Sequence, residues 1–269
     1  MGIRDALKKR EEKREEIRNN TDKPSDLPEG VGRFIRNNEL NDEGRTFVIL
    51  DDPDDWYFYF VHEDFQYKPY EVFVKKHTCI NSPRGLGSAL ENFEKKDGSK
   101  CLSCAAGIKR KLYFMVRLYD VEHDCFRIYD AKEFHAQNLV SAYDKIEKTA
   151  RKFNKEYTLV GDVVQMMKTS DGKSFTFDTA DDVELTEAQQ AKVKELLAEK
   201  PDYEFLGKFR NEEDIRGIIA EAAEGHADKS VLGQASPATV KSDDADKALA
   251  EDVKPVAESD DKKADNLPF

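Results

Sequence analysis

Three of the chain's four cysteines, at positions 79, 101 and 104, fall within one short stretch that begins with His77. In Cys101-x-x-Cys104 two thiolates can reach one tetrahedral ion, and His77 and Cys79 point to the same face if they lie on a strand. A metal ion held by these four side chains would fasten a strand to a distant turn. No other feature of the sequence constrains the fold as much.

The chemistry that these cysteines serve depends on the compartment. The N-terminus "MGIRDALKKREEKREE" lacks the apolar segment of a secretory signal, and no apolar run approaches the roughly 18 residues that a membrane span needs. We therefore expect a soluble, cytoplasmic protein with no membrane partner, where clustered cysteines are more typical of metal sites or catalysis than of disulfides. A redox Cys-x-x-Cys pair usually accompanies a βαβ pattern, which this sequence does not have.

These arguments predict one structural zinc ion bound by one histidine and three cysteines. The expected ligands are His77, Cys79, Cys101 and Cys104. His62 or His123 could take the place of His77, and Cys125 is the remaining thiol that could join the site. Small buried cysteines that bind no metal are the plain alternative.

Five runs of β-branched and aromatic residues, separated by clusters of Asp, Pro, Gly or Asn, predict strands over 45–50, 56–62, 70–78, 111–119 and 125–130. Helices are expected over 131–154 and 186–200, the second capped by Thr186, and a hairpin over 157–179 with its turn at Asp171-Gly172. The sequence thus predicts a mainly β chain with appended helices (α+β), built on a partly open five-stranded barrel of the oligonucleotide/oligosaccharide-binding (OB) type.

The composition changes along the chain. Residues 1–28 alternate acidic and basic clusters and are expected to form a charged N-terminal arm or helix. Residues 29–210 hold enough apolar and aromatic side chains for a core, with the zinc-binding subdomain at about 76–110. Residues 211–269 carry 15 acidic against 7 basic side chains and few large apolar groups, so we expect a largely disordered acidic tail.

A basic region is hidden by the net charge of -12. Residues 66–120 carry 11 Lys and Arg against 5 Asp and Glu, and eight aromatic residues lie between Trp56 and Tyr70. Basic and aromatic side chains together are typical of nucleic-acid binding, in which bases stack on rings while Lys and Arg follow the phosphates. The expected stacking residues are Tyr57 and Tyr59, whose hydroxyls tolerate water, with Tyr113 and Tyr119 as further candidates.

The chain ends in "DDKKADNLPF", in which acidic residues precede an apolar residue, Pro and Phe. Such an end can insert its Phe into an apolar pocket of another protein while a basic rim holds the carboxylates. The expected partner-binding residues are Asp265, Leu267, Pro268 and Phe269. An ordinary frayed tail is the alternative.

Together these features resemble the zinc-containing, OB-fold single-stranded DNA-binding proteins of tailed bacteriophages. The resemblance is carried by "CLSCAAGIKRKLYFMVRLYD" (101–120), by "HTC" (77–79), by "GDVVQMMKTSDGKSFTFDT" (161–179) and by the acidic tail with its Phe tip. The tail is also similar to the acidic tip of bacterial single-stranded DNA-binding proteins.

The resemblance implies binding without catalysis, in phage DNA replication, recombination and repair within the infected host cell. Lys75, Lys76, Lys109, Arg110 and Lys111 would contact phosphates with little sequence preference, and the acidic tail would recruit replication and recombination proteins. The class further implies a monomer in solution that lines up on DNA.

Two further classes of function fit parts of the sequence. A metal-dependent deaminase or nuclease would need an open metal position and a nearby acid, and no His-x-Glu motif accompanies the Cys-x-x-Cys pair. A zinc-ribbon regulator or scaffold that bridges proteins through its tail is the stronger rival. It predicts a preference for duplex DNA or no nucleic-acid binding.

Overall fold

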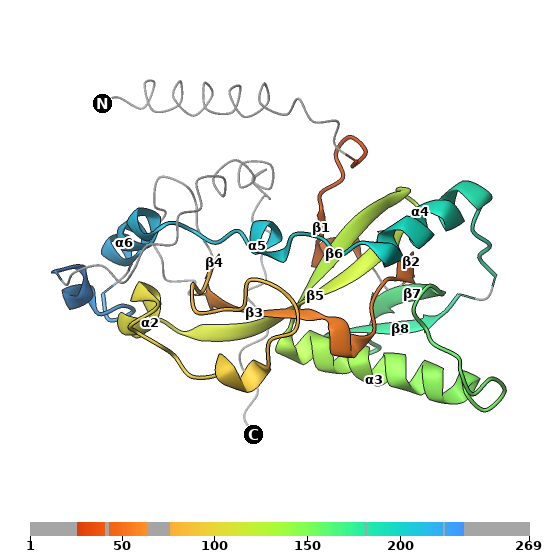
Figure 1. Cartoon of the computed structure of the whole chain (residues 1–269), viewed down its shortest axis with the longest axis horizontal. Helices are drawn as coiled ribbons and strands as arrows, with labels where there is room; N and C mark the ends of the chain where they lie inside the picture. Colours follow the sequence, from red (N-terminus) through yellow and green to blue (C-terminus); the bar gives the residue numbers. More distant parts are fainter. Residues whose placement is uncertain (1–25, 41–42, 64–75, 181, 223, 234–269) are drawn as a thin grey trace. The chain divides into compact units, whose positions relative to one another are not determined.

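The computed structural model describes residues 26–40, 43–63, 76–180, 182–222 and 224–233, all within one compact unit of the chain, residues 23–246. These described residues form a mixed α+β structure around one eight-stranded sheet (Figure 1). The strands are β1 (Phe34–Ile35), β2 (Arg45–Ile49), β3 (Tyr57–Glu63), β4 (Lys76–Thr78), β5 (Arg110–Asp120), β6 (Cys125–Lys132), β7 (Val163–Lys168) and β8 (Phe175–Thr179). The α-helices are α2 (Leu102–Ala105), α3 (Glu133–Ala150), α4 (Glu187–Ala198), α5 (Tyr203–Leu206) and α6 (Glu212–Glu221).

The sheet branches at β5. The main order of strands is β1-β6-β5-β2-β7-β8, while β3 pairs with β5 and carries β4 on its other edge. One edge of β5 is shared, because residues 110–115 pair with β3 and residues 118–120 pair with β2, and the opposite edge pairs with β6. Among the described residues, the outer strands β1, β4 and β8 do not pair with one another. The predicted α+β class is confirmed, but the described sheet differs from a five-stranded barrel: it has eight strands and does not close.

The predicted elements of the second half of the chain are confirmed to within a few residues. The hairpin of β7 and β8 turns at Gly172, whose φ of 67° lies in the left-handed region that glycine tolerates. Thr186 caps α4 through a capping box with Gln189. Helix α3 packs on β5, β6 and β8 and buries Leu139 and Tyr143 against the main core.

The chain is folded further toward its C-terminus than predicted. Helix α6 lies within the segment 211–269 that we expected to be a disordered tail, and it buries Ile215 and Ile219. These side chains pack with Val231 against Leu102 and Ile108, beside the Cys-x-x-Cys turn. The folded part of the chain therefore extends past the boundary expected at Asn211. A short amphipathic helix is stabilised there by apolar contacts with residues distant in the sequence, which local composition does not reveal.

A buried charge network joins β2, β5 and β6. The carboxylate of Asp120, which is fully buried, accepts from Arg45 at 3.0 Å, from Arg127 at 3.1 Å and from the backbone N–H of His123 at 3.1 Å. Glu39 also contacts both arginines, at 3.4 and 2.7 Å. Because each buried charge has opposite charges beside it, the network fixes how the β5–β6 hairpin meets β2.

Candidate metal centre

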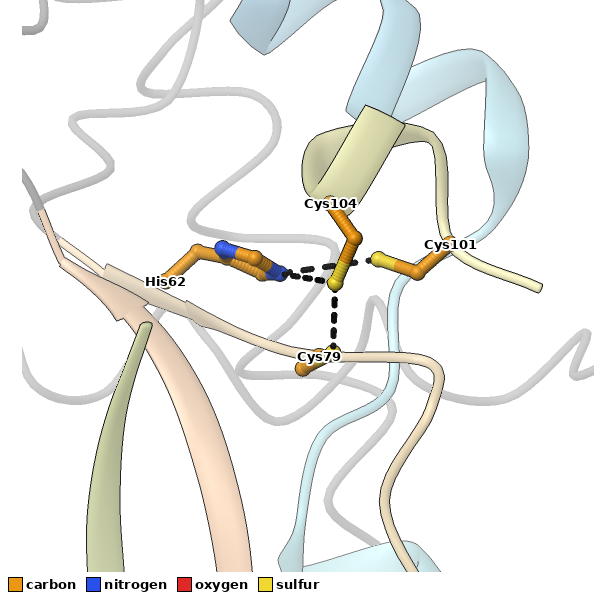
Figure 2. Close-up of side chains that lie close together, drawn as sticks. All are labelled: His62, Cys79, Cys101 and Cys104. Carbon is orange, nitrogen blue, oxygen red and sulfur yellow. Dashed lines mark hydrogen bonds between the residues drawn. The ribbon is translucent and has the colours of Figure 1, made fainter. Parts of the chain in front are cut away.

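Four side chains from three parts of the sequence converge at one end of the sheet. Among the described residues, His62, Cys79, Cys101 and Cys104 place one ligand atom each so that all four atoms lie within 4.8 Å of one another. Figure 2 shows the imidazole and the three thiols pointing toward a common centre. A Cys₃His set of this kind can bind a metal ion and is compatible with zinc.

Three of the distances between the ligand atoms match the edges of a tetrahedral zinc site. Cys79 Sγ lies 3.6 Å from Cys104 Sγ, and His62 Nε2 lies 3.5 Å from Cys101 Sγ and 3.6 Å from Cys104 Sγ. Zinc bonds of about 2.3 Å to sulfur and about 2.0 Å to nitrogen give tetrahedral edges of about 3.5 to 3.8 Å. The side chains therefore stand close to the separations that coordination requires.

Local structure brings each ligand to this point. His62 lies on β3 directly opposite His77 of β4, and Cys79 follows β4 with its N–H donated to Phe60 O at 2.8 Å. Cys101 is the N-cap of α2 and Cys104 lies in the same short helix. The helix ends at Ala105, and Gly107 shortly after it has a φ of 74° that reverses the chain so that it can enter β5.

The centre is closed to solvent. His62, Cys79 and Cys101 are fully buried and Cys104 is nearly so. The thiols pack with Phe60, and the partly buried side chains around them are Phe58, Ile80, Leu90, Phe93 and Leu112. Four protein ligands without solvent access are typical of structural metal sites, whereas catalytic sites keep one position open.

Neighbouring groups orient two of the ligands. His62 Nδ1 lies 3.3 Å from Lys109 O, and a proton donated there leaves Nε2 free to face the thiols. Arg110 donates to Cys79 Sγ at 3.9 Å and to the carbonyls of Phe93 and Glu94, and its guanidinium lies 3.9 Å from the Phe60 ring centroid. A thiolate-rich centre gains a compensating positive charge from this arginine.

Without a metal ion, the three thiols share protons unequally. Hydrogen bonds from Cys104 and Cys79 lower the pKa of Cys101, which also contacts His62. The hydrogen bond with Cys101 raises the pKa of Cys104 to about 11. Metal binding would replace the protons of these thiols, so its affinity should increase with pH.

His77, the histidine expected as the fourth ligand, lies outside this cluster, and His62, which we named as its substitute, takes its place. The His77 ring stacks on that of His62 with centroids 5.2 Å apart, and its Nε2 lies 2.8 Å from Ser103 Oγ. Burial, together with His62, lowers the pKa of His77 to about 3, so the ring is neutral at neutral pH. His123 and Cys125 do not complete the centre either, because His123 lies beside Arg45 and Cys125 is buried in β6 away from the cluster.

The two histidines are therefore expected to respond differently to substitution. His62→Ala removes a ligand and should reduce zinc affinity by more than about 100-fold, whereas His77→Phe keeps a ring stacked on His62 and should stay within about tenfold. Competition with a chromophoric chelator would measure both affinities. Equal losses in the two variants would contradict the ligand set.

The tyrosines expected to stack on bases are buried, so the predicted exposed platform is wrong. Their exposed fractions are 1% for Tyr57, 5% for Tyr59, 2% for Tyr113 and 0% for Tyr119. Tyr57 stacks on Tyr203 of α5 at 4.6 Å, in the segment that links α4 to α6 across the sheet (Figure 1). The alternation of side chains along β3 could not show which face of the strand is exposed to solvent, because both faces are covered by other parts of the protein.

The tyrosine hydroxyls are used within the protein. Tyr57 donates to Pro83 O at 2.5 Å, Tyr59 to Asp130 at 2.6 Å and Tyr113 to Glu63 at 3.1 Å, while Tyr119 donates to Asp124. Burial is the main cause that raises the pKa of Tyr119 and of the other three. These rings are packing residues with satisfied polar ends.

The expected phosphate-binding residues divide into two groups. Lys76, Lys109 and Lys111 are exposed. Arg110 is half-buried, and its guanidinium donates to Cys79 Sγ and to the carbonyls of Phe93 and Glu94, so it is engaged at the metal centre. Lys132, which we did not predict, lies on the same face as Lys76 and Lys111, and only the pairing of β5 with β6 brings it there.

Several predictions fall outside the described residues. These are the assignment of Lys75 to phosphate, of Asp265, Leu267, Pro268 and Phe269 to partner binding, and the nature of residues 1–25. Within the described part of the chain, none of the helices combines the length and apolar character of a membrane span.

Comparison with protein-family models, with curated proteins and with solved structures gives no match for this chain. The fold and the geometry of the metal centre therefore carry the functional argument on their own.

Proposed function

We propose that this protein binds single-stranded DNA without sequence preference and does no chemistry on it, with a structural zinc ion in the Cys₃His centre. The observation that carries the proposal is a row of lysines on one face of the sheet. Lys76 of β4, Lys111 of β5 and Lys132 of β6 all lie on the face that carries Tyr59 and Tyr113.

The lysine row has the exposure and extent that a phosphate backbone requires. The side chains of Lys76 and Lys111 are 44% exposed and that of Lys132 is 43% exposed. With β3 between β4 and β5, the row crosses three strand spacings, or about 14 Å. From these strands the ammonium groups converge above Tyr113, with Lys76 Nζ and Lys132 Nζ 4.6 and 5.9 Å from its ring centroid. Such a cluster of cations can contact the phosphates of a single strand, and phosphate contacts supply most sequence-independent affinity.

The metal centre would support this surface rather than bind DNA. It joins the β3–β4 hairpin, which carries Lys76, to the turn that precedes β5, which carries Lys111. We also propose that the sheet is related to the OB fold. The support for this relation is β5, which pairs with both β2 and β3 along one edge, as a strongly bent strand can. Recruitment of replication and recombination proteins by the acidic tail remains part of the proposal.

The proposal is tested by fluorescence anisotropy of labelled oligo-dT and of a matched duplex, each at two salt concentrations, with zinc quantified on the same preparation. We expect tight, salt-sensitive binding to the single strand and one zinc ion per chain. The triple variant Lys76→Gln, Lys111→Gln, Lys132→Gln should bind at least about tenfold more weakly, with the slope of log K against log salt reduced by up to about 2.

Lys192→Gln is the matched control, because Lys192 is a comparably exposed lysine that pairs with Asp124 at the far end of β5 and β6. It should leave binding unchanged. Equal affinity for duplex and single strand, or no binding at all, would overturn the proposal and favour a regulator or scaffold that bridges proteins.

A further inference from the structure

We propose that Glu63 and Asp130 act as built-in competitors of the DNA phosphates for the lysine row, and that they set the affinity and the salt dependence of binding. This inference rests on the proposed function. Both carboxylates lie beneath the lysines on the same face of the sheet, Glu63 at the end of β3 and Asp130 on β6.

Glu63 is held by two of the lysines and by a tyrosine. Its carboxylate lies 3.1 Å from Lys111 Nζ and 3.2 Å from Lys132 Nζ, and it accepts from the Tyr113 hydroxyl at 3.1 Å. Burial opposes ionisation of Glu63, but hydrogen bonds from Lys111 and Lys132 outweigh it and leave the pKa of this carboxyl below its ordinary value. The group is therefore an anion at neutral pH.

Asp130 repeats this arrangement with the third lysine. It accepts from Lys76 Nζ at 2.6 Å and from the Tyr59 hydroxyl at 2.6 Å. The Tyr113 ring lies between the two groups of charges, with Lys76 Nζ 4.6 Å and Lys132 Nζ 5.9 Å from its centroid. The three lysines are thus already engaged by protein anions and by an aromatic face.

The carboxylates and the lysines differ in how freely they can move. The side chains of Glu63 and Asp130 are 7% and 14% exposed and are fixed by buried tyrosine hydroxyls, whereas the lysines are nearly half exposed on flexible stems. A phosphate can therefore draw a lysine ammonium outward, but the carboxylate stays behind. Each such exchange replaces one ion pair by another and leaves two anions near each other, which weakens binding.

The charges on this surface predict that neutralising a carboxylate strengthens DNA binding. The three lysines contribute +3 and the two carboxylates -2, so this part of the described surface has a net charge of only +1. Neutralising Asp130 would release Lys76 for phosphate, neutralising Glu63 would release Lys111 and Lys132, and either change would raise the local charge. Tighter binding and a steeper dependence on salt should follow together.

The test compares oligo-dT binding of the full chain with that of Glu63→Gln and Asp130→Asn across a salt series. Each variant keeps an oxygen that can accept from its tyrosine. We expect each to bind at least about three- to fivefold more tightly at low salt. The slope of log K against log salt should steepen by about 0.7 in Asp130→Asn, which frees one lysine, and by up to about 1.4 in Glu63→Gln, which frees two.

Asp124→Asn is the matched control, because Asp124 also accepts from a tyrosine hydroxyl and pairs with a lysine, Lys192 at 2.5 Å, at the opposite end of the β5–β6 hairpin. It should not change binding. Thermal unfolding of all three variants shows whether each is folded, and either Glu63→Gln or Asp130→Asn suffices for the test.

The outcomes separate this inference from the proposed function. If the unaltered protein binds no single-stranded DNA, the proposed function fails. If the unaltered protein binds but the folded Glu63→Gln and Asp130→Asn variants bind oligo-dT with equal or lower affinity, the carboxylates do not compete with phosphate. The inference would then be overturned.

Discussion

Replacing Cys101 with serine is expected to abolish stoichiometric zinc binding and to lower the Tm by about 10 °C or more. Cys101 is a fully buried member of the metal centre, within 3.5 Å of His62 Nε2. Binding energy at a structural zinc site is also folding energy, about 10–16 kcal/mol in small zinc peptides. Even a third of that amount corresponds to a shift of about 10 °C in a domain of this size.

Cys125→Ser is the control for this prediction, because Cys125 is also a buried cysteine but lies outside the metal centre. It should retain one zinc ion per chain and lose only about 1 kcal/mol of stability. Elemental analysis and thermal unfolding, with and without a chelator, measure both effects. A chelator should lower the Tm of the unaltered protein to that of Cys101→Ser and leave Cys101→Ser unchanged; a chelator-insensitive Tm would contradict a structural metal.

Replacing Asp120 with asparagine should destabilise the fold by about 3–5 kcal/mol, because the buried Arg127 and the partly buried Arg45 would lose their common partner. Asp120 is fully buried and contacts Arg45 and Arg127 at 3.0 and 3.1 Å. Of the remaining carboxylates, Glu39 is shared between the two arginines and Glu122, which contacts Arg45 alone, is largely exposed, so they cannot replace Asp120. Urea unfolding followed by circular dichroism would show the loss as a lower midpoint at an unchanged m-value.

Glu122→Gln provides the matched comparison. Glu122 contacts the same Arg45 at 3.1 Å but its side chain is 54% exposed. Exposed ion pairs contribute little, so we expect a change below about 1 kcal/mol. Similar losses in the two variants would show that burial of Asp120 is not what makes its network important.

Much of the secondary structure could be predicted because its signals are local. The capping box at Thr186, the Asp171-Gly172 turn and the alternating runs of β2, β3, β5 and β6 each depend on residues close in the sequence. The three cysteines of the metal centre were predicted for the same reason, since Cys101-x-x-Cys104 is a local motif and Cys79 stands beside a strand.

Local patterns are therefore enough to predict the type of the elements, the three thiols and the basic character of residues 66–120. Tertiary packing selected His62 and not His77 for the centre, because the two histidines lie directly opposite each other on β3 and β4 and only their distant neighbours distinguish them. It also decided that the tyrosines are core and that Lys132 joins the lysine row. Burial and strand pairing between distant residues depend on which surfaces meet, and a period of two along one strand carries no information about its partners.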